Sequence, residues 1–464
     1  MLVLFFLLPA GLGTLLAWWL VPLSGAGRWT LWLGIGLAFG MALAAGSIWL
    51  LDLIGWSFSI GSLAGVMILT GLVSLALVYV LSGMKTIQAT WPASSEQLGG
   101  SPETLPWARW LVWILAAVVV FRYLTLLPDL LMRPVFPWDA WKLWAWKARV
   151  WFEFGELVPF VSGAEWLEAG GDEFVMEGVH HPHFVSLLML YPVLVIDYWD
   201  DSLIGIAWLV AGISAALMVH GLLRHLGAVP WLAWLGVYLL VSAPMFVSHV
   251  VLFGYADFWV MLYMLVFGVG LLLWIRHRGW QTLSLMLFAG LMMSVSKDTG
   301  VYWLPALSLA WLATLLSNWV LVIVVLVSAG LGAALLLVGV DPLLWLSSGR
   351  YGLEAGVSLE GVQGIVRHLF VRQDWLLAWY VLPVVFGLAA WRARFMPELR
   401  GLLVLSLLAT TYTLAGFVFT RAAEYAADGT LFSRIVLQFY PLALLLSILV
   451  MGQCLQSWRP DPKR

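Results

Sequence analysis

Apolar runs long enough to cross a lipid bilayer recur along most of this chain of 464 residues. The hydrocarbon core of a bilayer requires about 20 consecutive apolar residues in a helix. Hydrophobic residues make up 63% of the sequence and charged residues only 10%, whereas a soluble domain carries about 25% charge. These values exclude a disordered chain, a soluble globular domain and a nucleic-acid-binding protein. The sequence therefore predicts an all-α polytopic membrane protein.

The lengths and positions of the apolar runs predict about 13 transmembrane helices. The run Phe184–Tyr198 is shorter and contains Pro192, which favours a helix at the membrane interface rather than a span. The expected spans are 2–22, 30–54, 59–82, 107–127, 201–222, 230–250, 256–275, 280–296, 300–316, 318–339, 375–391, 400–420 and 434–456.

Charged residues are distributed unevenly between the two sets of loops that these spans separate. One set holds 12 of the 23 basic residues but only four of the 25 acidic residues. By the positive-inside rule this set is cytoplasmic, so the N-terminus lies outside. The basic residues of the set are Arg28, Lys85, Arg109, Arg224, Arg276, Arg278, Arg392, Arg394, Arg400, Arg459, Lys463 and Arg464.

We expect four parts along the chain. An N-terminal three-span unit (1–82) is followed by a cytoplasmic linker (83–106), a transmembrane core (107–456) and a cytoplasmic tail (457–464). The core includes two outer loops, 128–200 and 340–374. Because these loops are short for independent domains, we expect them to pack on the membrane surface as amphipathic helices. The stretch Trp138–Phe154, in which tryptophans are interleaved with Lys and Arg, is typical of such a helix.

The first candidate for chemistry is Asp139, which lies between Trp138 and Trp141 beyond the fourth expected span. A carboxylate partly shielded by indole rings is a stronger base than one in water, so Asp139 is a candidate general base. The two tryptophans would form an aromatic ledge at the membrane surface. An Asp before a helix is also a common N-cap, and the sequence does not favour one role over the other.

A second cluster lies directly before the expected interfacial helix and contains Glu177, His180, His181 and His183. Imidazole and carboxylate groups bind divalent metal ions, so Glu177, His180 and His183 are candidate metal ligands. Their spacing matches no known zinc motif, and a polar turn is the simpler alternative. The sequence favours binding of a phosphate or a sugar hydroxyl through His181 over metal binding, and it indicates no other cofactor.

Three further candidates, Asp257, Lys297 and Arg434, lie at the outer ends of expected spans. An ionised side chain near the membrane usually faces a partner or a cavity, because its burial is costly. Asp257 and Lys297 are therefore candidates for substrate binding, and a structural ion pair between them is the alternative. Arg434 is a candidate to hold a phosphate with two hydrogen bonds, or else it extends to the interface.

Short motifs follow one another in a defined order over residues 107–456. They are Trp138-Asp139-Ala140-Trp141 with Lys147 downstream, His181-Pro182-His183-Phe184, Gly254-Tyr255-Ala256-Asp257, Ser296-Lys297-Asp298-Thr299-Gly300, and Arg434 with Tyr440-Pro441. This order resembles the GT-C superfamily of membrane glycosyltransferases. More narrowly, it is similar to bacterial relatives of the protein O-mannosyltransferases and of the lipid A aminoarabinose transferase. The chain departs from several members of that family at Ala140, where they have a second acid.

The resemblance implies a GT-C-like core and a sugar donor linked to a polyprenyl phosphate. The acceptor would be a lipid, a glycan or a protein at the periplasmic or exterior face of a bacterial inner (plasma) membrane. Asp139 would be the base of an inverting single displacement, with an oxocarbenium-like transition state. The residues that would bind the donor sugar or phosphate are Lys147, His181, Asp257, Lys297 and Arg434.

Two other classes of protein remain open from the sequence. A transporter or flippase of lipid-linked sugars usually has inverted repeats and discontinuous helices around a mid-membrane site. The two halves of this chain show no such repeat, and its ionisable residues gather at one face. A structural or assembly factor would use the outer loops only for docking.

Cysteine reporters test the predicted topology. A cysteine at Gly170 or Ser347 should react with a membrane-impermeant thiol reagent added to intact cells, because both positions are expected outside. A cysteine at Ser94 should react only after the membrane is opened. Labelling of position 94 in intact cells would contradict the thirteen-span topology.

Overall fold

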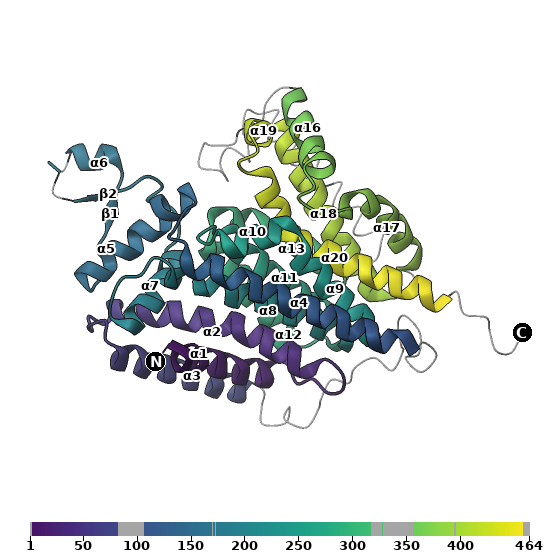
Figure 1. The fold of residues 1–464 in the computed structure, drawn as a ribbon, viewed down its shortest axis with the longest axis horizontal. Helices are drawn as coiled ribbons and strands as arrows, with labels where there is room; N and C mark the ends of the chain where they lie inside the picture. Colours follow the sequence, from purple (N-terminus) through teal and green to yellow (C-terminus); the bar gives the residue numbers. More distant parts are fainter. Residues whose placement is uncertain are drawn as a thin grey trace, which may run out of the picture.

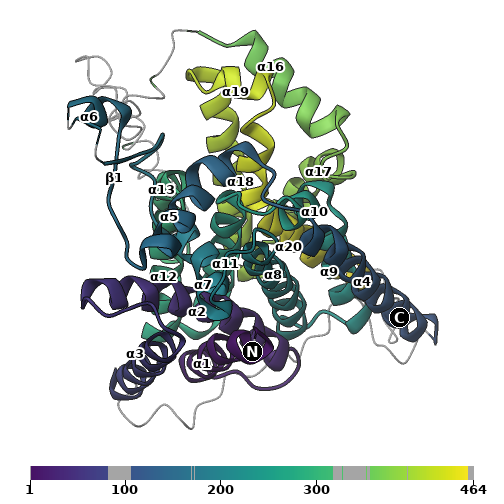
Figure 2. The ribbon, with the colours of Figure 1, turned by 60° about the vertical axis from the view of Figure 1, so that its left-hand side comes forward.

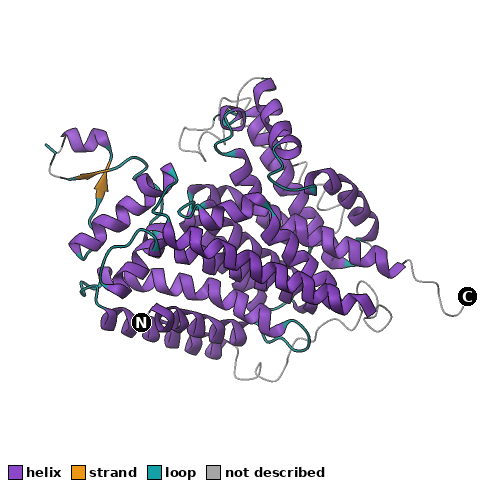
Figure 3. Cartoon of the chain, in the orientation of Figure 1, coloured by secondary structure: helices purple, strands orange, loops and turns teal. Residues whose placement is uncertain are grey.

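A computed structural model describes residues 2–81, 106–316 apart from 169 and 172, 327, 352, 356–393 and 396–457. These described residues form an all-α fold, with 79% of the structure helical and 18 α-helices among them (Figure 1). Two short strands, β1 (Phe160–Val161) and β2 (Phe174–Val175), pair in parallel and are orange in Figure 3. The predicted all-α polytopic membrane protein is therefore confirmed at the level of its class.

Seven helices within the described ranges are long and apolar enough to cross a membrane. An eighth span results if α9 (Pro230–Ser242) and α10 (Pro244–Val251), whose axes differ by 62°, cross as one. Pro244 opens α10, and a proline there removes a backbone donor and breaks the helix. The seven helices are α2 (Arg28–Leu53), α3 (Ile60–Leu81), α4 (Pro106–Met132), α8 (Ile206–His225), α11 (Asp257–His277), α18 (Pro397–Phe419) and α20 (Phe432–Ser457).

Four other expected spans coincide with shorter apolar helices. A helix rises about 1.5 Å per residue, so the 17 residues of α12 cover only about 25 Å of a hydrocarbon core about 30 Å thick. The expected span 318–339 lies outside the described residues except for residue 327. The linker 83–106 except for its last residue, most of 340–355 and the tail 457–464 except for its first residue also lie outside them. The four helices are α1 (Leu2–Leu20), α12 (Trp280–Ser296), α13 (Asp298–Ala313) and α17 (Ala378–Arg392).

Helix α11 forms the centre of the bundle. Every residue from Asp257 to Leu273 is buried, and α8, α12, α18 and α20 all contact this helix. The N-terminal helices α1 to α3 cover one side, where α2 packs against α8 (Figures 1 and 2). On the opposite side lie α16 (Leu359–Val366), a π-helical turn η5 (Arg367–Val371) and α19 (Ala423–Ala427).

The segment 128–200, which the sequence analysis expects as an outer loop, is mostly helical. The Trp-rich stretch forms a π-helical turn η3 (Ala140–Ala145) and α5 (Trp146–Phe154), as expected for a helix there. Helix α7 (Phe184–Ile196) coincides with the expected interfacial helix, and its residues from Phe184 to Val195 are all buried. The protein itself encloses α7, since α2 and α5 pack against it. The segment also contains the short helix α6 (Gly163–Glu168), and the 3-10 turn η4 (Leu203–Gly205) follows it before α8.

Glycines allow α1 and α2 to approach closely. A Cβ atom added to Gly36 would lie 2.5 Å from Thr14 Cα, and one added to Gly40 would lie 2.4 Å from the Pro9 carbonyl oxygen. No side chain fits at these distances, so the two backbones are in direct contact. This packing is the usual role of small residues spaced four apart in membrane helices.

A pair of alanine substitutions in α2 tests this contact. Gly36→Ala should lower the melting temperature in detergent, because forcing a methyl group into a packed site costs about 1–3 kcal/mol. Gly46→Ala in the same helix is the control, since no atom lies within 4 Å of its added Cβ. Alanine is a better helix former than glycine, so the control should melt at the same or a higher temperature. Equal melting temperatures for the two variants would contradict the packing.

Candidate functional site

Four charged residues that the sequence singled out converge at one end of the bundle. Asp257 begins α11, Lys297 lies between α12 and α13, and Arg434 is in the first turn of α20. Asp139 directly precedes η3. Because α11 packs against both α12 and α20, the ends of these helices come together.

The Asp257 carboxylate is the centre of this cluster and is fully buried. Lys297 Nζ donates to both of its oxygens, at 2.9 Å to Oδ1 and 2.8 Å to Oδ2. Arg434 Nε donates to Oδ2 at 2.8 Å, and Arg434 Nη2 lies 2.7 Å from the same oxygen. The ion pair between Asp257 and Lys297 that the sequence left as an alternative is therefore present, and Arg434 joins it.

Asp139 contacts the same cluster from the side that is exposed to solvent. Arg434 Nη1 donates to Asp139 Oδ2 at 2.7 Å. The Asp139 side chain makes no hydrogen bond that would cap η3, so it does not act as an N-cap here. Its side chain is 32% exposed, whereas that of Asp257 is 0% exposed. Of the two acids, Asp139 is the one that a substrate can reach.

Gln438 completes the shell around Asp257. Its Nε2 donates to Asp257 Oδ1 at 2.7 Å, and its Oε1 accepts a hydrogen bond from Trp303 Nε1 at 2.5 Å. The Arg434 guanidinium also lies over the Tyr255 ring, 4.4 Å from its centroid. Sequence reasoning missed Gln438. Its spacing of four residues from Arg434 places both side chains on one face of α20, and this spacing is the signal that would have found it.

The residue after Asp139, Ala140, is buried against a glycine turn. Gly254 has a φ of +100°, and a Cβ added there would lie 2.3 Å from Ala140 Cβ. The contact presses the segment that follows Asp139 against the turn before α11. Because Ala140 is 0% exposed, a longer side chain at this position would displace its neighbours.

Lys147 lies in a neighbouring cluster and not beside Arg434. Its ammonium donates to the His181 carbonyl oxygen at 3.0 Å and lies 3.4 Å from His183 Nδ1. Burial lowers the pKa of Lys147 to about 8, and the Asp298 carboxylate opposes this shift. Burial also lowers the pKa of His183 to about 4, with a further contribution from the charge of Lys147. His183 is therefore neutral at pH 7, and Lys147 is enclosed by protein.

His181 and His180 both face Asp298. Asp298 Oδ2 lies 2.8 Å from His181 Nδ1 and 3.4 Å from His180 Nε2. Of the three expected metal ligands, only His180 is in this group. Glu177 instead pairs with Lys142, with 2.5 Å between Oε2 and Nζ, and His183 packs against Lys147. Sequence reasoning did not group Asp298 with these histidines, although it lies within the Ser296–Gly300 motif.

The expected aromatic ledge is exposed. The Trp138 and Trp141 side chains are 61% and 45% exposed, and their rings meet edge to face with centroids 4.9 Å apart. Lys142 Nζ lies 4.8 Å from the centroid of the Trp138 ring. These indoles flank Asp139 in the sequence and give the open side of the site an apolar surface.

The end of the segment 340–374, the second expected outer loop, contacts the residue before Arg434. Ser433 Oγ donates to Asp374 Oδ2 at 3.0 Å and lies 2.9 Å from His368 Nδ1. This set is not a nucleophilic triad, because a triad places the acid on the histidine nitrogen opposite the serine. It anchors the end of the loop to α20, and sequence reasoning did not find it.

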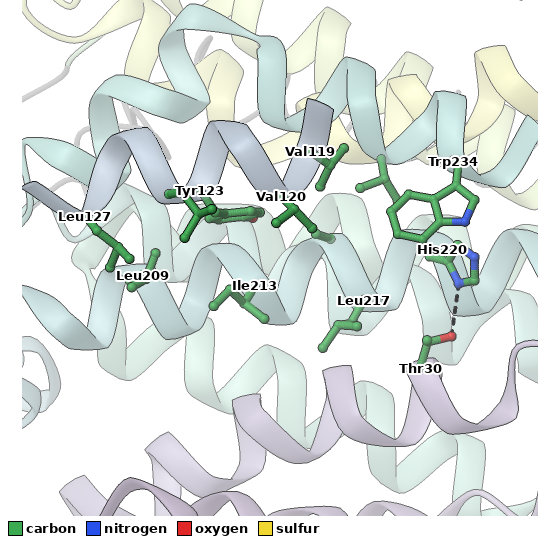
Figure 4. A pocket seen from close by; sticks show the side chains of 13 residues that line it. Thr30, Val119, Val120, Tyr123, Leu127, Leu209, Ile213, Leu217, His220 and Trp234 are labelled. Carbon is green, nitrogen blue, oxygen red and sulfur yellow. Dashed lines mark hydrogen bonds between the residues drawn. The ribbon is translucent and has the colours of Figure 1, made fainter. Parts of the chain in front are cut away.

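An apolar cavity of about 350 Å³ lies between α4, α8 and α9 (Figure 4). Leu127 and Leu209 line one end, and His220 and Trp234 line the other. His220 Nδ1 lies 3.2 Å from Thr30 Oγ1. No residue of the Asp257 cluster lines this cavity, so the charged cluster and the cavity are separate features.

No protein family, curated protein or solved structure matches the chain. The resemblance to the GT-C superfamily thus rests on the order of short motifs, and the chemistry of the site rests on the contacts of its own residues.

Neutralising either acid tests which of them holds the cluster together. Asp257→Asn should lower the melting temperature in detergent strongly, because breaking a buried ion pair costs about 3–5 kcal/mol. Asp139→Asn is the matched control, and partly exposed pairs contribute only about 0–1 kcal/mol. An equal loss of stability in both variants would show that Asp257 is not the centre of the cluster.

Proposed function

We propose that the protein is a GT-C-type glycosyltransferase that moves a sugar from a polyprenyl-phosphate donor to a lipid, glycan or protein acceptor. The observation that supports this most is the direct contact of Asp139, a half-open candidate base, with Arg434, a candidate phosphate-binding cation, at 2.7 Å. In this proposal the chain has about 13 spans, a GT-C-like core over 107–456 and an active site at the outer face of a bacterial inner membrane.

The reaction is a single displacement at the anomeric carbon. Asp139 accepts the proton of the acceptor hydroxyl or amine while the acceptor atom forms a bond to that carbon. The bond from the anomeric carbon to the phosphate oxygen breaks, and the polyprenyl phosphate leaves with the electron pair. Attack opposite to the leaving group inverts the anomeric configuration. The transition state has oxocarbenium character, as in other glycosyl chemistry.

Arg434 has the geometry to stabilise the leaving phosphate. Its Nε and Nη2 stay on Asp257, while Nη1 exchanges the Asp139 carboxylate for a phosphate oxygen. Negative charge grows on that oxygen in the transition state, so a fixed guanidinium favours the reaction. Asp257 then acts as a positioning residue, because it orients Arg434 and Lys297 from a buried position.

The remaining candidates have supporting roles in this proposal. Lys147 is buried and holds the turn before α7 through the His181 carbonyl oxygen. The exposed rings of Trp138 and Trp141 receive the donor lipid at the membrane surface.

A transporter or flippase of lipid-linked sugars is the second candidate. The observation that favours it is the 62° break between α9 and α10, since transporters commonly use discontinuous helices. A transporter needs no general base, so the role of Asp139 separates the two functions.

Asp139→Asn tests the proposed function, since Asn keeps the volume of Asp and loses the basic carboxylate. Transfer from a synthetic polyprenyl-phosphate sugar by purified protein should fall by about 10²–10⁴, the usual size of a general-base contribution. Donor binding should persist, because the substitution removes a negative charge that repels the phosphate.

Asp129→Asn is the control for this experiment. Asp129 is an exposed carboxylate paired with Arg133 on α4, and its substitution should leave transfer unchanged. Near-normal transfer by Asp139→Asn would remove Asp139 from the mechanism. If wild-type protein instead moves lipid-linked sugar across vesicle membranes and transfers none, the transporter function is correct.

A further inference from the structure

Two distant parts of the chain bring three metal-binding side chains together beside the charged cluster. His180 and His181 lie in the turn before α7, and Asp298 is the first residue of α13. One imidazole nitrogen from each histidine and one carboxylate oxygen lie within 4.8 Å of one another. We propose that these three residues bind a divalent transition-metal ion such as Zn²⁺. This inference does not depend on the proposed glycosyl transfer.

The spacing of the three atoms is suited to one ion. Zn²⁺ holds its nitrogen and oxygen ligands at about 2.0–2.2 Å, so neighbouring ligand atoms in a tetrahedral site are about 3.4 Å apart. Asp298 Oδ2 lies 2.8 Å from His181 Nδ1 and 3.4 Å from His180 Nε2. The second of these distances already matches, the first is shorter by about 0.6 Å, and all three ligand atoms lie within 4.8 Å of one another. Three protein ligands leave a fourth position for water.

The orientation of His181 also fits a shared ion. Its Nδ1 is shielded from solvent and close to Asp298 Oδ2, but this approach lacks the geometry of a hydrogen bond. Ligands of one metal ion point at the ion and not at each other. The orientation of His181 is therefore compatible with a cation shared by the two side chains.

The surrounding structure holds the His181 ring in place. Gly178 has a φ of +68°, and a Cβ added there would lie 2.8 Å from His181 Cδ2. The Trp144 ring packs beside His181, with centroids 5.3 Å apart, and Lys147 fixes the His181 carbonyl oxygen. Such contacts outside the ligands themselves orient metal-binding groups and raise metal affinity.

The site is open to ions from solution. The side chains of His180 and Asp298 are 43% and 30% exposed, and that of His181 is 13% exposed. A bound ion would cross-link the outer loop to the first turn of α13, directly beside Lys297. Metal binding should therefore stabilise this end of the fold.

Zn²⁺ titration of the full-length protein in detergent tests the site, in competition with a chromogenic chelator at neutral pH. Wild-type protein should bind one ion. Asp298→Asn and His180→Gln should each lower the affinity at least about 100-fold, since outer contacts alone contribute about 10–100-fold. Glu177→Gln, a carboxylate of the same loop, is the control and should bind as wild type does. Zn²⁺ should raise the melting temperature of wild-type protein and not that of Asp298→Asn.

Gly178→Ala gives a second and independent test, because it keeps all three ligands. The added methyl group displaces the His181 ring, so affinity should fall while Glu177→Gln stays unchanged. Absence of stoichiometric Zn²⁺ binding by wild-type protein would overturn the proposal. Binding that either Asp298→Asn or His180→Gln leaves unchanged would also overturn it.

Discussion

The buried carboxylate of Asp257 is the interaction on which this end of the molecule depends. An ion removed from water loses several kcal/mol of hydration unless charges and hydrogen bonds replace it. Lys297, Arg434 and Gln438 supply that replacement, and they come from the α12–α13 junction and from α20. Helices that are far apart in the sequence must therefore end at one point. The apolar packing along α11 brings them there, and the carboxylate fixes their final positions.

Electrostatic balance links this buried centre to the open side of the site. Two cations surround Asp257, so one positive charge remains uncompensated there. Asp139 supplies the second negative charge from a position that solvent reaches. The half-exposed acid is thus held by the same guanidinium that the buried acid orients. In the proposed reaction, a donor phosphate that takes the place of Asp139 on Arg434 would keep the charge balance and release the carboxylate.

Much of this arrangement follows from the sequence, because charged residues at the ends of apolar runs are conspicuous. Four residues of the site are identifiable in this way: Asp139, Asp257, Lys297 and Arg434. The positions of the helices along the chain follow from the apolar runs. The convergence of these four residues cannot be identified from the sequence. It depends on how the helices are ordered around the bundle, and contacts such as that of Gly34 with Ser214 determine this order. Uncharged Gln438 and the Ser433–Asp374 contact are inconspicuous among apolar neighbours. The burial of helix α7 was not predictable, because length alone does not distinguish protein from lipid as its surroundings.

The planar guanidinium of Arg434 has a further consequence for how this site tolerates change. The rigid guanidinium contacts the carboxylates of both Asp139 and Asp257, so its dimensions fix the distance between these two carboxylates. A residue inserted in the first turn of α20 would rotate Arg434 by about 100° around the helix axis and separate it from both carboxylates at once. The loop before α20 can absorb such an insertion, whereas the helix cannot. The phase of α20, more than the conformation of any loop, determines whether the two acids face one another across a single cation.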